Sequence, residues 1–217
     1  YIAYVSNKLS QEQTVEYSDI KLMKMNLDGK IDNSWNPQQL LYNTELRNFD
    51  PVICIDEIGN VILCYVTKGG IVSGQCKSGS YDIVLCKLNN NGRVIKLLQS
   101  PIFNTPGENT HPSMVYRSGF LYITYQTTDN ISGQIKKGTT DIVVMKINSL
   151  TFEVAWICQD SKLNTISDNS SPNITTDKEG NCYIVYETSG IIRGEITSGQ
   201  GRKVVVCRLN GNGVVEW

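Results

Sequence analysis

Hydrophobic residues along this chain gather in short runs that are separated by polar, glycine-containing turns. The runs at 61–66, 121–125 and 142–145 are apolar at nearly every position. Strands that are buried on both faces show this pattern, whereas a strand with one solvated face alternates. No segment sustains the spacing of an amphipathic helix. Helices therefore cannot cover the predicted sheets, and each sheet must be covered by other sheets.

The pattern repeats about every 60 residues, which indicates one supersecondary unit used four times. The repeats align on Lys24, Lys87, Lys146 and Arg208, at steps of 63, 59 and 62 residues. Each repeat predicts four strands, but the first repeat lacks the first of them, so fifteen strands are expected. Two-residue hairpin turns are predicted at Asp28-Gly29, Asn91-Gly92 and Asn212-Gly213, and a longer turn at 148–153.

Four-stranded antiparallel sheets that are arranged radially and cover one another form a β-propeller, and we predict this all-β fold. The expected blades are residues 1–44, 45–105, 106–165 and 166–217. Because the first blade would lack its first strand, the count favours a segment of a larger ring. The alternative is that a second chain completes the ring.

A family resemblance follows from the repeated motif. Each unit approximates P-x-I-x-x-D-x-x-G-N-x-Y-I-x-Y-x-T followed by G-x-x-D-I-V-x-x-K-L-N-x-N-G-x-V-x-W. This motif resembles the bacterial-type seven-bladed β-propeller repeat family and, more distantly, NHL-type blades, over essentially the whole chain. The resemblance implies a propeller used for display and binding rather than for a defined reaction.

Composition narrows the classes of function. The formal net charge of −1 argues against a protein that binds nucleic acid by bulk electrostatics, because such a protein needs a basic face. No apolar run approaches the roughly 18 residues of a membrane span. The seven cysteines show no C-x-x-C spacing and exchange with other apolar residues between repeats. We therefore expect buried thiols, a reducing (cytoplasmic) compartment or a virus particle, and neither a metal nor a cofactor.

Two loop motifs recur on the face where propellers usually bind ligands. The first, N-T-x-x-x-N-x-x-P, contains Asn48, Asn109 and Asn169. These asparagines either fix the turn that enters the first strand or form a ring of amides that faces a sugar or the backbone of a partner.

The second motif, [IV]-x-G-[QE]-x-x-x-G, contains Gln75, Gln134 and Glu195 in the loop between strands two and three. It predicts hairpin tips that either form a rim for a partner or pack on each other.

His111, the single histidine, lies in the loop sequence ENTHP beside Glu108. An acid–base pair there is conceivable, but no nucleophile is linked to it by a motif, and we predict no catalytic residue. The favoured function is a non-enzymatic scaffold that binds a protein partner or assembles with itself. The alternative is a lectin-like or carbohydrate-active propeller with its site on the loop face and a glycan as ligand.

Overall fold

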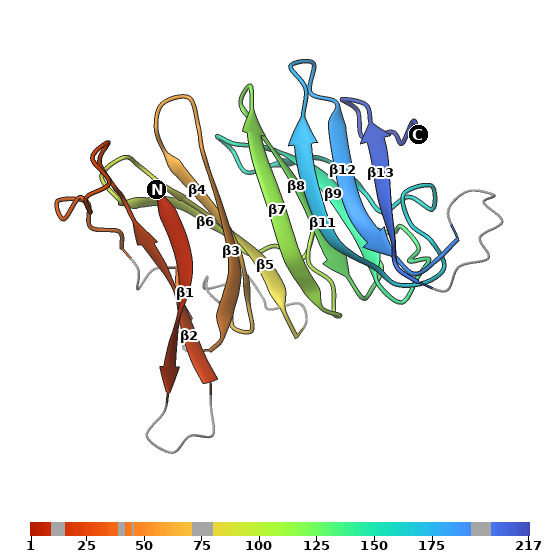
Figure 1. Ribbon diagram of the computed structural model, residues 1–217, viewed down its shortest axis with the longest axis horizontal. Coiled ribbons are helices and arrows are strands. Elements are labelled where there is room, and N and C mark those ends of the chain that lie inside the picture. The colour runs from red at the N-terminus through yellow and green to blue at the C-terminus, as the bar shows by residue number, and fades with distance from the viewer. Residues whose placement is uncertain (10–15, 39–41, 45, 71–79, 192–200) are drawn as a thin grey trace.

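The computed structural model describes residues 1–9, 16–38, 42–44, 46–70, 80–191 and 201–217. These residues form thirteen strands and no helix (Figure 1). The strands are β1 (Ile2–Leu9), β2 (Glu16–Met23), β3 (Asn48–Ile55), β4 (Val61–Thr67), β5 (Asp82–Leu88), β6 (Val94–Leu98), β7 (Asn109–Arg117), β8 (Phe120–Thr127), β9 (Asp141–Asn148), β10 (Val154–Cys158), β11 (Asn169–Thr176), β12 (Cys182–Thr188) and β13 (Lys203–Leu209).

The strands form four antiparallel sheets, which we number blades 1 to 4 along the chain. Their strand orders are β1-β2, β3-β4-β5-β6, β7-β8-β9-β10 and β11-β12-β13. Each sheet lies within one of the four predicted blade ranges. The first strands of blades 2, 3 and 4 lie side by side, and the two chain termini lie toward opposite ends of the array (Figure 1).

Thirteen strands replace the fifteen expected, because the fourth run is not a strand in blades 1 and 4. In blade 1 the pairing reduces to the bridge between Met25 and Ile31, after which Asp32 accepts backbone and side-chain hydrogen bonds from Ser34 and turns the chain. In blade 4 the run ends with the bridge between Leu209 and Val215 and two further backbone bonds at Arg208.

In blades 1, 2 and 4 the turns between strands three and four contain three residues rather than the two predicted. In blade 2, Asn89 N–H donates to Arg93 O, and the N–H of Gly92 donates back to Asn89 O. The Asn89 side chain accepts from the N–H groups of Asn91 and Arg93 and so closes a wider loop. Gly92 has φ +82°, which a glycine adopts without strain. The longer turn predicted at 148–153 is confirmed.

The hydrophobic core consists of three clusters, each between two neighbouring blades. In blade 2, every residue of β4 and β5 is buried. Alternate residues point to opposite neighbours: Ile62 and Ile83 pack against blade 3, whereas Leu63 and Val84 pack against blade 1. Burying one such side chain stabilises the fold by about 2 kcal/mol. The prediction that sheet covers sheet is confirmed.

The linkers between blades are held from both sides. Asn104 accepts from the N–H of Ile83 and donates to the Ile83 carbonyl, which ties the linker to the preceding blade. Tyr125 of the following blade donates its hydroxyl to Phe103 O at 2.5 Å. The equivalent contacts recur at the other two linkers through Asn43, Tyr65, Asn164 and Tyr186.

Over the described ranges, the structure contains no helix that could span a membrane.

Candidate functional site

The candidate site lies on the loop face, which we define as the end of the blades that carries the linkers into β3, β7 and β11 and the connections from strand two to strand three. Three asparagines of the first loop motif, Asn48, Asn109 and Asn169, begin β3, β7 and β11. They do not face a ligand, because all three are 0% exposed.

Asn169 shows how these amides are used. Its Oδ1 accepts from the hydroxyls of Thr165 and Thr188, at 2.9 and 3.0 Å. Its Nδ2 donates to the carbonyls of Thr140, Thr165 and Ser167. Because Thr140 belongs to the preceding blade, the amide joins two blades and the linker between them. Of the two interpretations of this motif, the ring of ligand-facing amides does not fit these buried side chains, which join neighbouring blades instead.

The second loop motif forms no protruding hairpin in blade 3. A tight turn does occur between Ile131 and Gln134. However, the Gln134 side chain donates to Ile157 O and accepts from the N–H of Gln159, so the loop lies against the edge of its own blade. Gln75 and Glu195 lie outside the described residues.

His111 lies on β7 at a bulge that recurs in three blades. The register of each first strand shifts there, and Asp50, His111 and Ser171 have φ values of 49°, 55° and 54°. The imidazole is exposed, and its Nδ1 lies 3.1 Å from the Thr110 hydroxyl. The bulge therefore directs one residue per blade out of the regular pleat.

The repeat symmetry breaks at three positions that surround this bulge. Blade 2 carries Phe49, Val66 and Tyr81, and the rings of Phe49 and Tyr81 contact edge to face, with centroids 5.2 Å apart. The equivalent residues of blade 3 are Thr110, Gln126 and Thr140, and those of blade 4 are Ser170, Glu187 and Arg202. The loop face thus changes from aromatic to charged across three blades.

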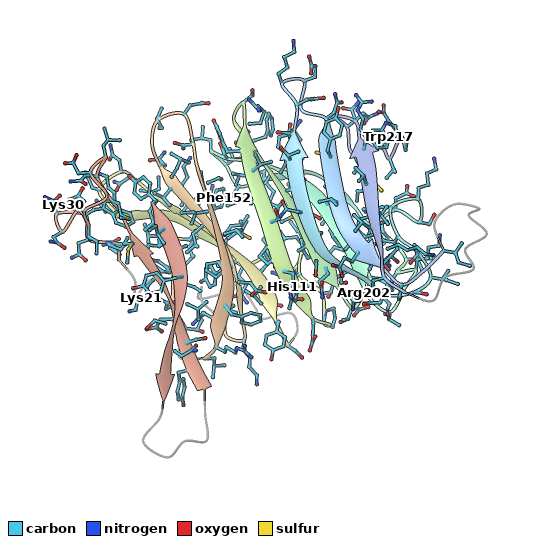
Figure 2. The ribbon with its side chains drawn as sticks, in the orientation of Figure 1. Lys21, Lys30, His111, Phe152, Arg202 and Trp217 are labelled. Carbon is cyan, nitrogen blue, oxygen red and sulfur yellow. The ribbon has the colours of Figure 1, made fainter. Side chains whose placement is uncertain are left out.

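Arg202 organises the charged end of this surface. Its guanidinium donates to Glu187 Oε2 at 3.1 Å, to Asp168 Oδ2 at 3.0 Å and to Ser170 Oγ at 2.7 Å. The other oxygen of Asp168 accepts from the Thr140 hydroxyl of blade 3. We call Asp168, Ser170, Glu187 and Arg202 the mouth cluster. His111 and Arg202 lie at the same edge of the array (Figure 2).

The mouth cluster keeps its charges accessible. The side chains of Asp168, Glu187 and Arg202 are 33%, 46% and 56% exposed. Two carboxylates that share one guanidinium, beside a serine hydroxyl, can accept and donate several hydrogen bonds in a fixed geometry. Reasoning from the sequence missed this cluster, although the aligned repeats carry its signal: Val66, Gln126 and Glu187 occupy one repeat position.

Within the described ranges, no group of three histidine, cysteine or acidic side chains is placed to hold a metal ion. Six cysteines are described, and none of them forms a disulfide. Burial raises the pKa of Cys54 and of Cys182 to about 12. It also raises the pKa values of Cys64, Cys86 and Cys158.

These pKa shifts predict five unreactive thiols, because the thiolate is the nucleophile. The sixth, Cys207, is only 4% exposed and is closed to the reagent by burial. We expect the six described thiols of a Cys76→Ser variant to resist Ellman's reagent at pH 8 while the protein is folded. All six should react after denaturation in guanidinium chloride. Rapid reaction of the folded variant would contradict this expectation.

No family model and no curated protein matches this sequence. Solved structures do resemble the fold. A levansucrase from B. megaterium superposes with a TM-score of 0.50 at 12% identity, over 99% of this chain and 63% of the levansucrase chain. At that identity the likeness shows the fold alone.

Further solved structures resemble the chain at a TM-score of 0.48. An α-L-arabinofuranosidase from Lactobacillus brevis matches at 10% identity over 96% of this chain and 67% of its own. An endo-1,4-β-xylanase from Bacteroides thetaiotaomicron matches at 14% identity over 99% and 75%. These neighbours are five-bladed β-propeller glycoside hydrolases.

The comparisons correct three predictions. The propeller blade fold is supported, but neither the seven-bladed repeat family nor NHL-type blades are. The prediction of a non-enzymatic scaffold is contradicted, because the neighbours named above are enzymes that act on carbohydrates. The comparisons support neither a structural nor a viral protein. The prediction that the chain is not an enzyme is contradicted by the same finding. This chain has an all-β fold of antiparallel sheets that is consistent with the blades of a partial β-propeller.

Proposed function

We propose that this chain is part of a carbohydrate-active propeller that binds its glycan on the loop face, at the mouth cluster. The observation that carries the proposal is the break in repeat symmetry. Where blade 2 carries Phe49, Val66 and Tyr81, blade 4 carries a buried serine beside an accessible glutamate and arginine. Residues that serve packing alone would be expected to repeat with the blades.

The chemistry of this surface suits a sugar. Carboxylates accept hydrogen bonds from hydroxyl groups, while guanidinium and amide N–H groups donate to hydroxyl and ring oxygens. Gln126 and His111 extend the polar surface into blade 3. At the blade 2 end, Phe49 and Tyr81 supply aromatic rings of the kind on which the apolar face of a sugar ring packs.

The reaction class follows from the carboxylates. Glycoside hydrolysis is usually performed by a pair of Asp or Glu side chains, one on each side of the bond that breaks. Asp168 and Glu187 contact the same guanidinium, so their carboxylates lie close together. Glu187 is the more exposed of the two, and we assign it the direct contact with substrate, with Asp168 beside it.

Similar folds support the choice of substrates to test. The solved neighbours include a levansucrase, an arabinofuranosidase and a xylanase. We therefore select levan, arabinan and xylan, and measure binding by isothermal titration calorimetry and turnover by release of reducing sugar. We expect at least one polysaccharide to bind. Glu187→Gln and Arg202→Ala should each weaken that binding roughly 10-fold to 100-fold, as expected for a lost charge-assisted hydrogen bond.

Blade 4 provides a matched control. Glu216 pairs with Arg208 in the same blade, and the adjacent Trp217 lies at the opposite end of the blade from Arg202 (Figure 2). Glu216→Gln should therefore leave glycan binding unchanged. Binding without release of sugar would leave a lectin-like site and overturn the catalytic assignment. If no polysaccharide binds, or if Glu216→Gln weakens binding as much as Glu187→Gln, the proposal is wrong.

A further inference from the structure

A hollow of about 520 Å³ lies at the outer edge of the junction between blades 2 and 3. Both blades are complete four-stranded sheets, so both walls of the hollow are present. One wall consists of β6 and the linker that follows it, and the other consists of β10 and the turn before it. All its described lining residues are apolar except Ser100 and Glu153.

The size and the lining of this hollow suit a small aromatic molecule. Binding sites for small molecules are usually hollows of about 300 to 1,000 Å³ with mostly apolar walls and few polar groups. Phe103, Phe152 and Trp156 line this one, and aromatic rings pack well against another flat ring. The Trp156 indole N–H already donates to Gly211 O at 3.0 Å, so this ring presents carbon atoms to the hollow.

Phe152 breaks the repeat at this junction. Blades 1, 2 and 4 carry a glycine at the same place in the turn, namely Gly29, Gly92 and Gly213. Phe152 has the same left-handed backbone, with φ +60°, which is costly for a bulky side chain. Strained residues of this kind concentrate at functional sites and ligand clamps. Here the strained backbone holds an aromatic ring, only 4% exposed, at the edge of the hollow.

Lys96 breaks the repeat on the other wall. It occupies the position of Trp156 and Trp217 in blades 3 and 4. Its Nζ lies 5.5 Å from the centroid of the Phe152 ring and donates to the carbonyls of Leu150 and Thr151 in the same turn. Lys96 therefore holds the long turn of blade 3 against blade 2 and keeps the Phe152 ring in place.

Glu153 supplies charge to the hollow. It is the charged residue among the described lining residues, and its Oε2 accepts from the Thr151 hydroxyl at 3.1 Å. The equivalent residues of blades 1 and 2 are basic, namely Lys30 and Arg93. Packing at the junction can explain the ring of Phe152, but it explains neither this reversal of charge nor the hollow that remains beside the ring.

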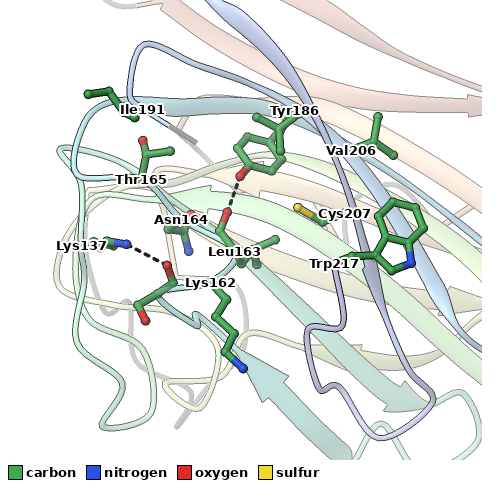
Figure 3. A pocket seen from close by; sticks show the side chains of 12 residues that line it. Lys137, Lys162, Leu163, Asn164, Thr165, Tyr186, Ile191, Val206, Cys207 and Trp217 are labelled. Carbon is green, nitrogen blue, oxygen red and sulfur yellow. Dashed lines mark hydrogen bonds between the residues drawn. The ribbon is translucent and has the colours of Figure 1, made fainter. Parts of the chain in front are cut away.

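The junction between blades 3 and 4 provides a comparison. A hollow of about 150 Å³ lies there, lined by Trp217, the equivalent of Trp156 (Figure 3). Its charged lining residues, among those described, are Lys137 and Lys162. Hollows thus occur at both junctions, but they carry opposite charge, and only the one between blades 2 and 3 combines aromatic walls with a carboxylate.

We propose that the hollow between blades 2 and 3 binds a small aromatic amine, with its ring against Phe152 and Trp156 and its ammonium group beside Glu153. The carboxylate complements the charge of the ammonium group, and it would repel an aromatic acid of the same shape. This site is separate from the proposed glycan site. Phe152 lies toward the opposite end of the blades from His111 and Arg202 (Figure 2).

Two probes with the same ring and opposite charge test the proposal on the whole chain. Tryptamine carries an ammonium group, and indole-3-acetate carries a carboxylate. We expect tryptamine to bind at least about 5-fold more tightly than indole-3-acetate in isothermal titration calorimetry at pH 7. In NMR spectra of the 15N-labelled protein, tryptamine should shift the indole N–H signal of Trp156.

Two variants separate the roles of charge and ring. Glu153→Gln keeps the shape of the side chain, and the preference for tryptamine over indole-3-acetate should fall below about 2-fold. Phe152→Gly introduces the residue that the other three blades carry, and it should weaken tryptamine binding roughly 10-fold. Glu179→Gln, at an exposed carboxylate of a blade 4 turn, is the matched control and should leave binding unchanged.

Several outcomes would overturn the proposal. These are no binding of tryptamine at low millimolar concentration, equal affinity for the two probes, unchanged binding to Phe152→Gly, or NMR shifts at Trp35 or Trp217 without one at Trp156. Circular dichroism checks that each variant remains folded. If Phe152→Gly unfolds, Glu153→Gln decides, because Glu153 is exposed and its replacement does not disturb the core.

Discussion

Replacing Lys87 with methionine is expected to lower the free energy of unfolding by about 3 kcal/mol at pH 7, because it leaves a buried carboxylate without its charged partner. Lys87 Nζ lies 2.9 Å from Asp56 Oδ2, and the two side chains are 6% and 4% exposed. The same ammonium donates to Ser149 O across the blade interface. Urea or guanidinium denaturation of both proteins measures the difference.

The pH dependence of this loss is also predicted. Burial by itself would raise the pKa of Asp56, but hydrogen bonds from Lys87 and Asn60 outweigh it and lower the pKa. A lowered folded-state pKa contributes stability above the unfolded value of about 3.9, and that contribution is lost as the pH falls through the folded value. In Lys87→Met the pKa of Asp56 should rise. The stability gap between wild type and variant should therefore narrow below about pH 4.

Lys146 provides the control for this prediction. It occupies the position of Lys87 in blade 3, where it contacts the Gly211 carbonyl and the rings of Phe120 and Tyr122. Lys146→Met therefore leaves no buried carboxylate without a charged partner, and we expect the free energy of unfolding to fall by only about 1 kcal/mol. Equal losses in the two variants, or a gap for Lys87→Met that does not change with pH, would contradict the argument.

The second large effect is expected for Asn169→Ala, which should lower the free energy of unfolding by about 3 kcal/mol. The substitution leaves the hydroxyls of Thr165 and Thr188 without their shared acceptor, and the Thr140 carbonyl without the amide donor. Asn169, Thr165 and Thr188 are buried, and Thr140 is half-buried. Chemical denaturation, compared with the wild type, measures the loss.

Asn173→Ala is the matched control, because Asn173 lies on the same strand with an exposed side chain that accepts from the Ser113 hydroxyl. Its replacement should change stability by less than about 0.5 kcal/mol. An Asn169→Ala protein that is as stable as the wild type but no longer binds a ligand would indicate that the Asn169 amide contacts that ligand. If Asn169→Ala loses stability and Asn173→Ala does not, the result supports the role of Asn169 in holding two blades together.

Much of the fold could be predicted from the sequence, because packing repeats with the blades. Tyr65, Tyr125 and Tyr186 recur at nearly constant spacing, and all three donate to the linker ahead of their own blade. The apolar runs of strands two and three likewise required a neighbour on each face, which the clusters between blades provide. Because each blade needs the same packing contacts, the residues that make them recur at regular spacing in the sequence.

The turn length could not be predicted in the same way. An Asn-Gly pair is compatible with a two-residue turn, but the side chain of Asn89 reaches two N–H groups farther along and selects a three-residue loop. The strand count failed for a related reason. The run after Gly29 is extended in sequence pattern, yet Asp32 bonds to Ser34 and ends the pairing. Local side-chain bonds decided both outcomes.

The mouth cluster shows the limit of reasoning along the chain. Asp168 and Arg202 are 34 residues apart, and Glu187 and Arg202 are 15 apart, with no motif that connects them. Comparison of the repeats marks Glu187 as unusual, but it does not show which residues it meets. These residues come together only when β11, β12 and β13 pair.

The sequence by itself determined the period, the blade type and the faces along which the blades pack, because side-chain polarity that repeats at fixed spacing is a local property. Tertiary structure alone decided which polar residues are buried and which are accessible. Asn169 and Arg202 are both polar residues in sequence, yet Asn169 is 0% exposed and Arg202 is 56% exposed. The physical reason is that burial of a polar group depends on partners from another blade, and those partners are distant in the chain.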